Sequence, residues 1–364
     1  MNHNLQLKCT ATVLNADGTV AFTKNCNPQY NRRSTISIKV RNSDGTVASK
    51  RTIPMKSFVR IFMRAFQGRF FSTGLITSEF DVVADAADDT HGLQIGTDST
   101  APAATDTTLT AKISHGSDSG EMSYGVSLVG ACAVDGANYK FVLTRSFTNV
   151  SGNSITIKEA GAVFKSGGFQ PYDYYLIAHD LLNGSTGEVI ADGQTIDLVF
   201  TIYMANDSGL TQQFLKLLRV DFADGSNDAL TDTTGASITS VSPFTGYKQL
   251  SANGDDSYGV VIGTSDAAVD ATLYCLGAKL LTADFIHQVY EYVAATTVGN
   301  TTSLVSKRTF TNISGAPVTV EEAGIYGYGK GPGHYVMLAR TLTGGIVVGD
   351  SQSIQISYTF EVTT

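Results

Sequence analysis

The segment RSFTNVSGNSITIKEAG, residues 145–161, occurs a second time as RTFTNISGAPVTVEEAG, residues 308–324. Ten of the 17 positions are identical, and the two copies align without a gap. Apolar and polar residues alternate on both sides of Ser151-Gly152, which is the pattern of two strands joined by a tight turn. The segment therefore predicts a duplicated β unit with a hairpin at the centre of each copy.

An arginine and a glutamate keep the same separation in both copies. If each hairpin is symmetric about its turn, Arg145 faces Glu159, and Arg308 faces Glu322. We expect each pair to form a cross-strand ion pair that stabilises its hairpin. A catalytic carboxylate is the alternative, but no second acid or histidine is duplicated beside either glutamate.

Shorter matches extend the repeat on both sides of this segment. GLQIGT at residues 92–97 matches GVVIGT at 259–264, and TDTTL at 105–109 matches VDATL at 269–273. Farther along, DGQTIDLVFTI at 192–202 matches DSQSIQISYTF at 350–360. Turn residues recur about every eight to twelve positions, which favours a sandwich or barrel over β-α-β units.

A short amphipathic helix is predicted before each β repeat, in residues 54–68 and from residue 210 to 220. Pro54 and Gly68 are expected to start and end the first helix, and Thr211 to cap the second. Each helix is expected to pack on its own β domain or on a neighbouring subunit; a membrane surface is the alternative for the basic stripe of the first. The candidate interface residues are Phe58, Ile61, Phe62, Phe66, Phe214, Leu217 and Leu218.

Residues 1–53 are expected to form an N-terminal β-hairpin arm, with turns at Asp17-Gly18 and Asp44-Gly45. Cys9 and Cys26 are predicted to face each other across the first hairpin, as reduced thiols or as a disulfide. The predicted fold is mainly β, with two tandem duplicated antiparallel β-sandwich domains at 54–208 and 209–364. Each domain is preceded by its helix.

Composition excludes several classes of protein. The net charge of −8 argues against a nucleic-acid-binding surface, and no apolar run is long enough to span a membrane. The six histidines and four cysteines have no metal-ligand spacing, the acidic segment 221–232 does not fit an EF-hand, and the glycine-rich segment 327–334 is not a P-loop. Asp106 and Asp270 are expected to bond backbone amides in turns, with calcium binding as the alternative. We therefore expect no cofactor, no metal and no enzymatic activity.

The order of these motifs resembles structural proteins of tailed bacteriophages. The resemblance is carried by Ile95-Gly96-Thr97, Ala101-Pro102, Leu176-Ile177-Ala178, and residues 105–109, 147–161 and 194–202, and more weakly by the second copy. It implies a β-rich virion component of the tail, neck, head-to-tail connector or fibre type. It also implies assembly with itself and with other virion proteins. The four cysteines form no CxxC pair, which predicts synthesis in a reducing cytoplasm, that of the host.

A receptor- or carbohydrate-binding adhesin module is the alternative function. Tyrosine-rich segments at 172–175 and 326–335 offer aromatic rings on which sugars of a host surface glycan stack. The chain contains no Trp, which counts against a sugar-binding platform.

Overall fold

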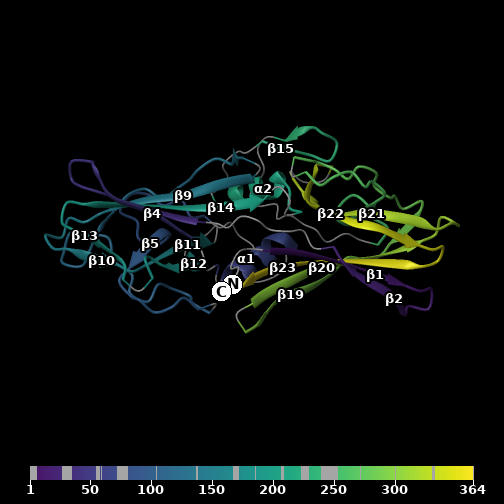
Figure 1. The fold of residues 1–364 in the computed structure, drawn as a ribbon, viewed down its shortest axis with the longest axis horizontal. Helices are drawn as coiled ribbons and strands as arrows, with labels where there is room; N and C mark the ends of the chain where they lie inside the picture. The colour runs from purple at the N-terminus through teal and green to yellow at the C-terminus, as the bar shows by residue number, and fades with distance from the viewer. Residues whose placement is uncertain are drawn as a thin grey trace.

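The computed structural model describes most of the chain. The described residues are 6–26, 35–54, 58, 60–71, 81–103, 105–136, 138–166, 172–184, 186–205, 209–222, 229–238, 253–270, 272–299, 301–329 and 333–363. They form 23 β-strands and two α-helices, and every strand pairing within the sheets is antiparallel. The molecule is elongated, with β-sheets at both ends and the helices between them (Figure 1). The prediction of a mainly β chain with two short helices is confirmed.

A seven-stranded sheet occupies one end of the molecule. Its strands in spatial order are β4 (Val47–Pro54), β3 (Thr35–Arg41), β14 (Thr195–Ala205), β9 (Asn138–Thr148) and β6 (Ser123–Tyr124), with β7 (Leu128–Val129) and β8 (Ala133–Asp135) also on β9. Along β9, buried and half-buried residues alternate, because successive side chains of a strand point to opposite faces.

A six-stranded sheet occupies the other end. Its strands in order are β18 (Phe285–His287), β20 (Thr301–Asn312), β23 (Ser353–Thr363), β1 (Gln6–Leu14) and β2 (Val20–Asn25), and β19 (Glu291–Val298) also pairs with β20. Alternate residues of β20 are buried throughout, as in β9.

A three-stranded sheet accompanies each large sheet. The first contains β12 (Asp173–Leu181), β11 (Glu159–Ser166) and β5 (Gly92–Gly96), and the second contains β17 (Gly259–Gly263), β21 (Val318–Tyr328) and β22 (Tyr335–Val348). All residues of β5 and β17 are buried, so these strands are covered on both faces. Two small sheets pair β10 (Ile155–Ile157) with β13 (Glu188–Ile190) and β15 (Leu230–Thr231) with β16 (Ser237–Ile238). We call β3–β14 with their sheets the first half, and β1, β2 and β17–β23 the second half.

The two N-terminal hairpins belong to different halves. β1 pairs with β2 and β3 pairs with β4, which confirms both predicted hairpins. However, β1 also pairs with β23 along its whole length, and β3 pairs with β14. The expectation of a separate N-terminal arm is therefore corrected, because the hairpins complete the chain's own sheets.

The predicted hairpin at Ser151-Gly152 is wrong, and so is its copy at Ser314-Gly315. The strand before the first turn, β9, pairs with β14, whereas β10 after the turn pairs with β13. In the second copy, β20 pairs with β23 and β21 pairs with β22. The turn therefore carries the chain from one sheet to another.

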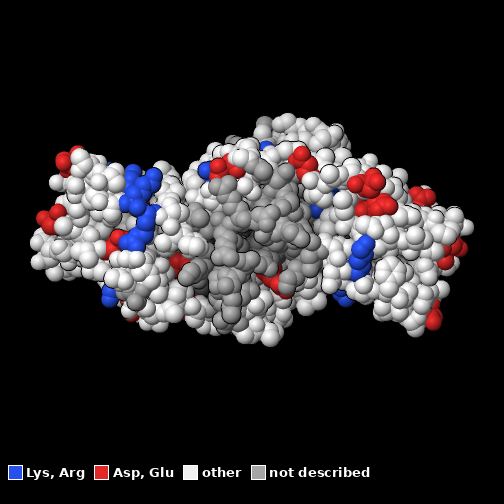
Figure 2. All heavy atoms as spheres, viewed as in Figure 1, with Lys and Arg blue, Asp and Glu red and all other residues white. Residues whose placement is uncertain are grey.

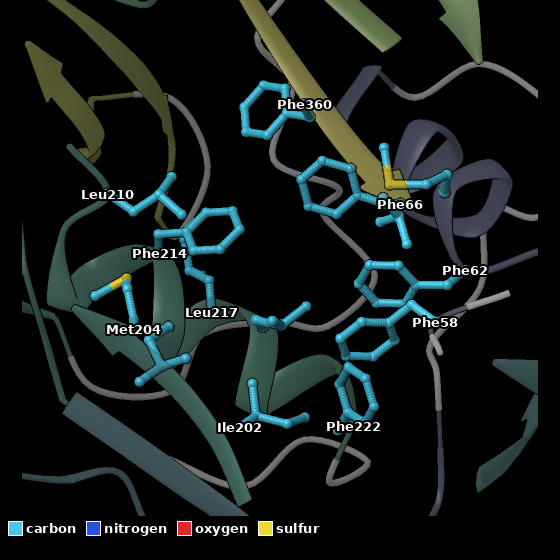
Figure 3. Close-up of a cluster of buried hydrophobic side chains, with 14 of the residues drawn as sticks. Phe58, Phe62, Phe66, Ile202, Met204, Leu210, Phe214, Leu217, Phe222 and Phe360 are labelled. Atoms are coloured by element: carbon cyan, nitrogen blue, oxygen red, sulfur yellow. The ribbon is translucent and has the colours of Figure 1, made fainter. Parts of the chain in front are cut away.

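The two helices, α1 (Arg60–Phe71) and α2 (Gln212–Phe222), meet in a core between the halves (Figure 3). Phe66 lies 5.9 Å from Phe214 and 5.2 Å from Phe360 of β23, measured between ring centroids. Figure 3 also shows Ile202 and Met204 of β14 in this cluster. The core thus joins both helices to strands of both large sheets.

The candidate interface residues are consequently internal. Six of the seven predicted side chains are buried: Phe58, Phe62, Phe66, Phe214, Leu217 and Leu218. Ile61 lies in α1, and its side chain is outside the described residues. These side chains bind one half of the chain to the other. The helices therefore pack within the chain, which was one of the two expected alternatives, and these residues do not contact a neighbouring subunit.

The helix ends follow their predicted signals only in part. The Phe214 amide donates to Thr211 Oγ1 at 3.4 Å, so the predicted cap of α2 is confirmed. Gly68 does not end α1, because the helix continues to Phe71. Pro54 ends β4 rather than starting the helix.

Candidate functional site

The duplicated arginine of the first copy binds backbone carbonyl groups. Arg145 is buried on β9, and its Nη1 donates to the carbonyls of His91 and Leu93 at 2.9 and 3.0 Å. Its Nε donates to the Gly125 carbonyl at 2.8 Å, and its Nη2 donates to the Asp88 carbonyl. Burial lowers the pKa of Arg145. This guanidinium joins β9 to β5 and to the acidic loop before β5.

Arg308 makes the same contacts in the second copy. Its Nε donates to the Gln288 carbonyl at 2.7 Å and its Nη2 to the Asp255 carbonyl at 2.5 Å. Nη1 lies 3.4 Å from the carbonyl oxygens of Tyr258 and Val260. Burial lowers the pKa of Arg308 to about 10.

The loops that receive these arginines share a sequence that the repeat analysis missed. DDTHG at residues 88–92 corresponds to DDSYG at 255–259. In each loop the first aspartate accepts the amide two residues later, Thr90 or Ser257, at 2.8 Å. The side-chain hydrogen bond shapes a turn in both loops, and the guanidinium binds carbonyls of the same turn.

The asparagine of FTN-x-SG fixes the turn that changes sheets. Asn149 Nδ2 donates to the Ile190 carbonyl at 2.8 Å, and Asn312 Nδ2 donates to the Val348 carbonyl at 2.9 Å. Each Oδ1 accepts the amide two residues later, at 3.1 and 2.9 Å. Both asparagines are fully buried, so their hydrogen bonds replace those lost to water.

The glutamate of the second copy forms a buried ion pair. Arg340 Nε lies 2.7 Å from Glu322 Oε2, and the two side chains are 1% and 0% exposed. The other carboxylate oxygen accepts the Ala278 amide at 3.0 Å, and Arg340 Nη1 donates to the Ala268 carbonyl at 3.0 Å. The pair therefore ties β21 and β22 to the segment between β17 and β18.

The first copy has a histidine at the position of Arg340. Glu159 Oε1 accepts the Ala111 amide at 2.9 Å, and Glu159 Oε2 lies 2.9 Å from His179 Nε2. His179 Nδ1 lies 2.7 Å from Asp106 Oδ2. Burial lowers the pKa of His179, but hydrogen bonds and the negative charges of both carboxylates outweigh burial and raise it overall. Protonation of His179 thus stabilises the folded chain fully below pH ~6.5, and this contribution is lost as the pH rises through the raised pKa.

Glycine is required beside both glutamates. A Cβ at Gly96 would overlap the Glu159 carboxylate and lie 2.7 Å from the Ala111 carbonyl oxygen. A Cβ at Gly263 would lie 2.5 Å from Glu322 Oε1. The IGT motif is therefore the counterpart of the EAG motif across the sheet, because β5 pairs with β11 and β17 with β21.

The ion pairs predicted from the hairpin register are consequently wrong. Arg145 lies opposite Leu198, and Glu159 lies opposite Gly96. Arg308 and Glu322 are likewise on different sheets. A cation at the same position of both repeats, His179 and Arg340 in YYLIAHD and YVMLART, was the available signal for the true partners of the glutamates.

His287 is buried where the first half has Tyr124. Tyr124 pairs with Phe147 and His287 with Phe310, and the Tyr124 hydroxyl donates to the Ile113 carbonyl at 2.5 Å. Both ring nitrogens of His287 are buried without a hydrogen-bond partner in the described structure. Burial, followed by the charge of Arg308, lowers the pKa of His287 to about 4.

In contrast to these buried clusters, the outer strands of the large sheets are exposed. β2, β4 and β19 each pair with one strand in the described part of the chain. Most of their residues are exposed on both faces. Apolar side chains among them include Val20, Val47 and Val298, which are 62%, 56% and 81% exposed.

Basic side chains gather over the end of the molecule that carries β3 and β4 (Figure 2). Arg41 Nη2 and Lys39 Nζ lie 2.6 and 3.0 Å from the Asp197 carboxylate, and Arg51 pairs with Glu188. Carboxylates of neighbouring strands therefore offset much of this positive charge.

Three half-buried tyrosines form a cluster in the second half. Tyr258 stacks on Tyr335 with centroids 5.6 Å apart, and Tyr328 lies 5.0 Å from Tyr258. Burial and the hydrogen bond with Tyr258 raise the pKa of Tyr328 to about 12. At the equivalent place in the first half, Lys165 pairs with Asp81 at 2.9 Å.

The structure also shows where the remaining residues and segments singled out in the sequence lie. The Ala103 amide donates to Asp106 at 2.8 Å and the Thr272 amide to Asp270 at 2.7 Å, which confirms their role in turns. Residues 223–228 and 330–332 lie outside the described residues. Across the ranges that the structure describes, no group of three or more His, Cys, Asp or Glu side chains is placed to hold a metal ion. No described helix has the length and apolarity to cross a membrane.

Comparison with known proteins gives no match: no protein family, no curated protein and no solved structure is similar to this chain at a significant level.

Substitution of Glu322 by Gln is expected to lower the free energy of unfolding by roughly 3–5 kcal/mol, because Arg340 then keeps a buried charge without its carboxylate. Urea denaturation at pH 7 measures the effect. The neighbouring half-buried Glu321 provides the control, since Glu321→Gln removes one charge without touching Arg340. Equal losses in the two variants would contradict the structural role of the ion pair.

The His287 environment predicts acid sensitivity. The unfolded chain binds a proton at this side chain below pH ~6.5, whereas the folded chain does so only near pH 4. Stability is therefore full above pH ~6.5 and declines as the pH falls, by about 3 kcal/mol from this residue. His287→Tyr, which copies Tyr124, should reduce the difference in unfolding free energy between pH 7 and 4.5.

His334→Tyr is the comparison variant. The His334 side chain is 50% exposed and lies 3.2 Å from the Asp232 carboxylate, so this change removes a different histidine contact and leaves the His287 site intact. A pH dependence that is the same in wild type and His287→Tyr would exclude His287 as its source.

Proposed function

We propose that this chain is a structural protein of a tailed-phage virion that works through contacts between subunits at the tail, neck or capsid surface. It performs no catalysis in this role. It is made in the host cytoplasm and becomes part of the particle. The proposal starts from the sequence resemblance and is supported by how the molecule uses its duplicated residues.

The duplicated arginine, asparagine and glutamate residues stabilise the fold. Arginine, asparagine and glutamate in both copies bind backbone groups, and Glu159 and Glu322 are 0% exposed. A substrate needs access to a reacting group, and these carboxylates offer no accessible surface. Duplication of such contacts favours a repeated structural unit over a repeated active site.

We further propose that the two halves are tandem duplicated β-sandwich domains, each preceded by a helix. The strand order β4-β3-β14-β9-β6 corresponds to β2-β1-β23-β20-β18, and β12-β11-β5 corresponds to β22-β21-β17. Isolated bridges from Phe58 to Ala178 and from Leu210 to Ala339 precede the two helices in the same way. This correspondence adds the hairpins to the repeated unit.

The observation that carries the assembly proposal is the exposure of the outer strands. A strand with one paired edge presents free N–H and C=O groups to another chain, and charged or proline residues commonly protect it. β2 has the sequence VAFTKN, with one charged residue and exposed Val20 and Phe22. Such an edge suits β-strand addition between copies of this chain or with other virion proteins.

A receptor- or carbohydrate-binding module is the second candidate, and the tyrosine cluster favours it. Tyr258, Tyr328 and Tyr335 present aromatic rings and hydroxyls together, which is the chemistry that sugar rings contact. Under this alternative, Tyr335→Ala abolishes binding on a glycan array while the oligomeric state is unchanged.

Light scattering after size-exclusion chromatography, together with electron imaging, tests the assembly proposal. The wild-type chain should form rings or fixed oligomers, and Val20→Lys with Phe22→Lys should shift the population towards monomers by at least about tenfold, since each charge must be desolvated. Val150→Lys is the control, because Val150 is 45% exposed in a turn outside the strands.

A chain that stays monomeric at high concentration and binds glycans would overturn the structural role. Oligomers unchanged by the strand substitutions would instead exclude β2 as the contact.

A further inference from the structure

Cys9 and Cys26 lie opposite each other on the β1–β2 hairpin. The Cys26 amide donates to the Cys9 carbonyl at 2.8 Å, one step beyond the pair Thr10 and Asn25. Opposed residues that share such a bond have Cα atoms about 5.5 Å apart. Disulfides span Cα separations of about 4.4–6.8 Å, so the backbone is already placed for a bridge.

The two thiols have different surroundings. Cys9 is fully buried, in the strand between β23 and β2. Cys26 is half-buried at the end of β2, with its Sγ 3.8 Å from the carbonyl oxygens of Lys24 and Thr343. The Cys26 thiol is therefore accessible to a reagent, while the Cys9 thiol opposite it is buried.

Charge and hydrogen bonding favour the same order of reaction. The hydrogen bond with Cys9, and then the positive charge of Lys24, lower the pKa of Cys26 despite its partial burial. The same hydrogen bond, with burial, raises the pKa of Cys9. Cys26 is thus the thiolate that reacts first, and Cys9 remains a protonated thiol during this first step.

We propose that Cys9 and Cys26 form a thiol–disulfide site that reacts with small disulfides and closes into a bridge across the N-terminal hairpin. The Cys26 thiolate attacks one sulfur of the small disulfide, forms a mixed disulfide and releases one small thiolate. Cys9 then loses its proton and attacks Cys26 Sγ, which releases the second small thiolate and leaves the protein disulfide. Two protein thiols are oxidised and one small disulfide is reduced to two thiols.

The bridge has a structural consequence. β1 is held between β23 and β2, so a covalent link between β1 and β2 closes the hairpin that extends the six-stranded sheet. An oxidised chain should resist opening of this sheet more than a reduced one, since the bridge limits the unfolded state. This inference does not depend on a virion role.

The test uses the whole chain and oxidised glutathione at neutral pH. Peptide mapping should show a Cys9–Cys26 disulfide, with the loss of two hydrogen atoms in mass, before Cys132 or Cys275 reacts. The Tm of the oxidised chain should rise by a few degrees, and a reductant should reverse the change.

Variants separate the two steps. Cys9→Ser should trap glutathione on Cys26, whereas Cys26→Ser should leave residue 9 unmodified. A stable glutathione adduct on Cys26 of the wild type, or first reaction at Cys132 or Cys275, would overturn the proposal. So would a lower Tm after oxidation.

Discussion

The buried guanidinium groups of Arg145 and Arg308 connect parts of the chain that no strand pairing connects. Each reaches from a central strand of a large sheet to the first strand of a three-stranded sheet, and also binds the loop before it. A buried cation is costly unless its donors are satisfied, and the fork of an arginine matches several carbonyls at once. In the DDTHG and DDSYG loops, the carbonyl groups of Asp88 and Asp255 accept hydrogen bonds from the guanidinium, which thereby connects the two sheets of each half.

The polar interior gives the two halves different responses to pH. The partner of Glu159 is His179, whose protonated form is stabilised by two carboxylates. The partner of Glu322 is an arginine, a side chain that does not lose its charge at physiological pH. His287 has the opposite tendency, since it must be neutral to be buried beside Arg308. Raising the pH therefore weakens one cluster in the first half, and lowering the pH weakens one site in the second half.

Sequence reasoning succeeded where the information was local. The Asp17-Gly18 and Asp44-Gly45 turns, the Thr211 cap and the mainly β character all depend on residues a few positions apart. It failed where a strand pairs with a strand far away in the sequence. Ser151-Gly152 looks like a hairpin turn, but β9 before it pairs with β14 and β10 after it pairs with β13. The helices were recognised from their apolar faces, yet the same pattern serves an internal or an external contact. Only the three-dimensional arrangement distinguishes these cases.

The hairpins also set the order in which the fold can be completed. β1, near the start of the chain, pairs along its whole length with β23, near the other end of the chain, so that Gln6 lies opposite Glu361. By contrast, β3 finds β14 within the first part of the chain. Pairing between distant segments is slow, because the loop must close before the contacts stabilise it. The first half can thus complete its large sheet during synthesis, whereas the second-half sheet must wait for β23. Before β23 is synthesised, β1 has only β2 as a strand partner. Cys9 and Cys26 face each other across this hairpin, so they lie in the strands whose sheet is completed last.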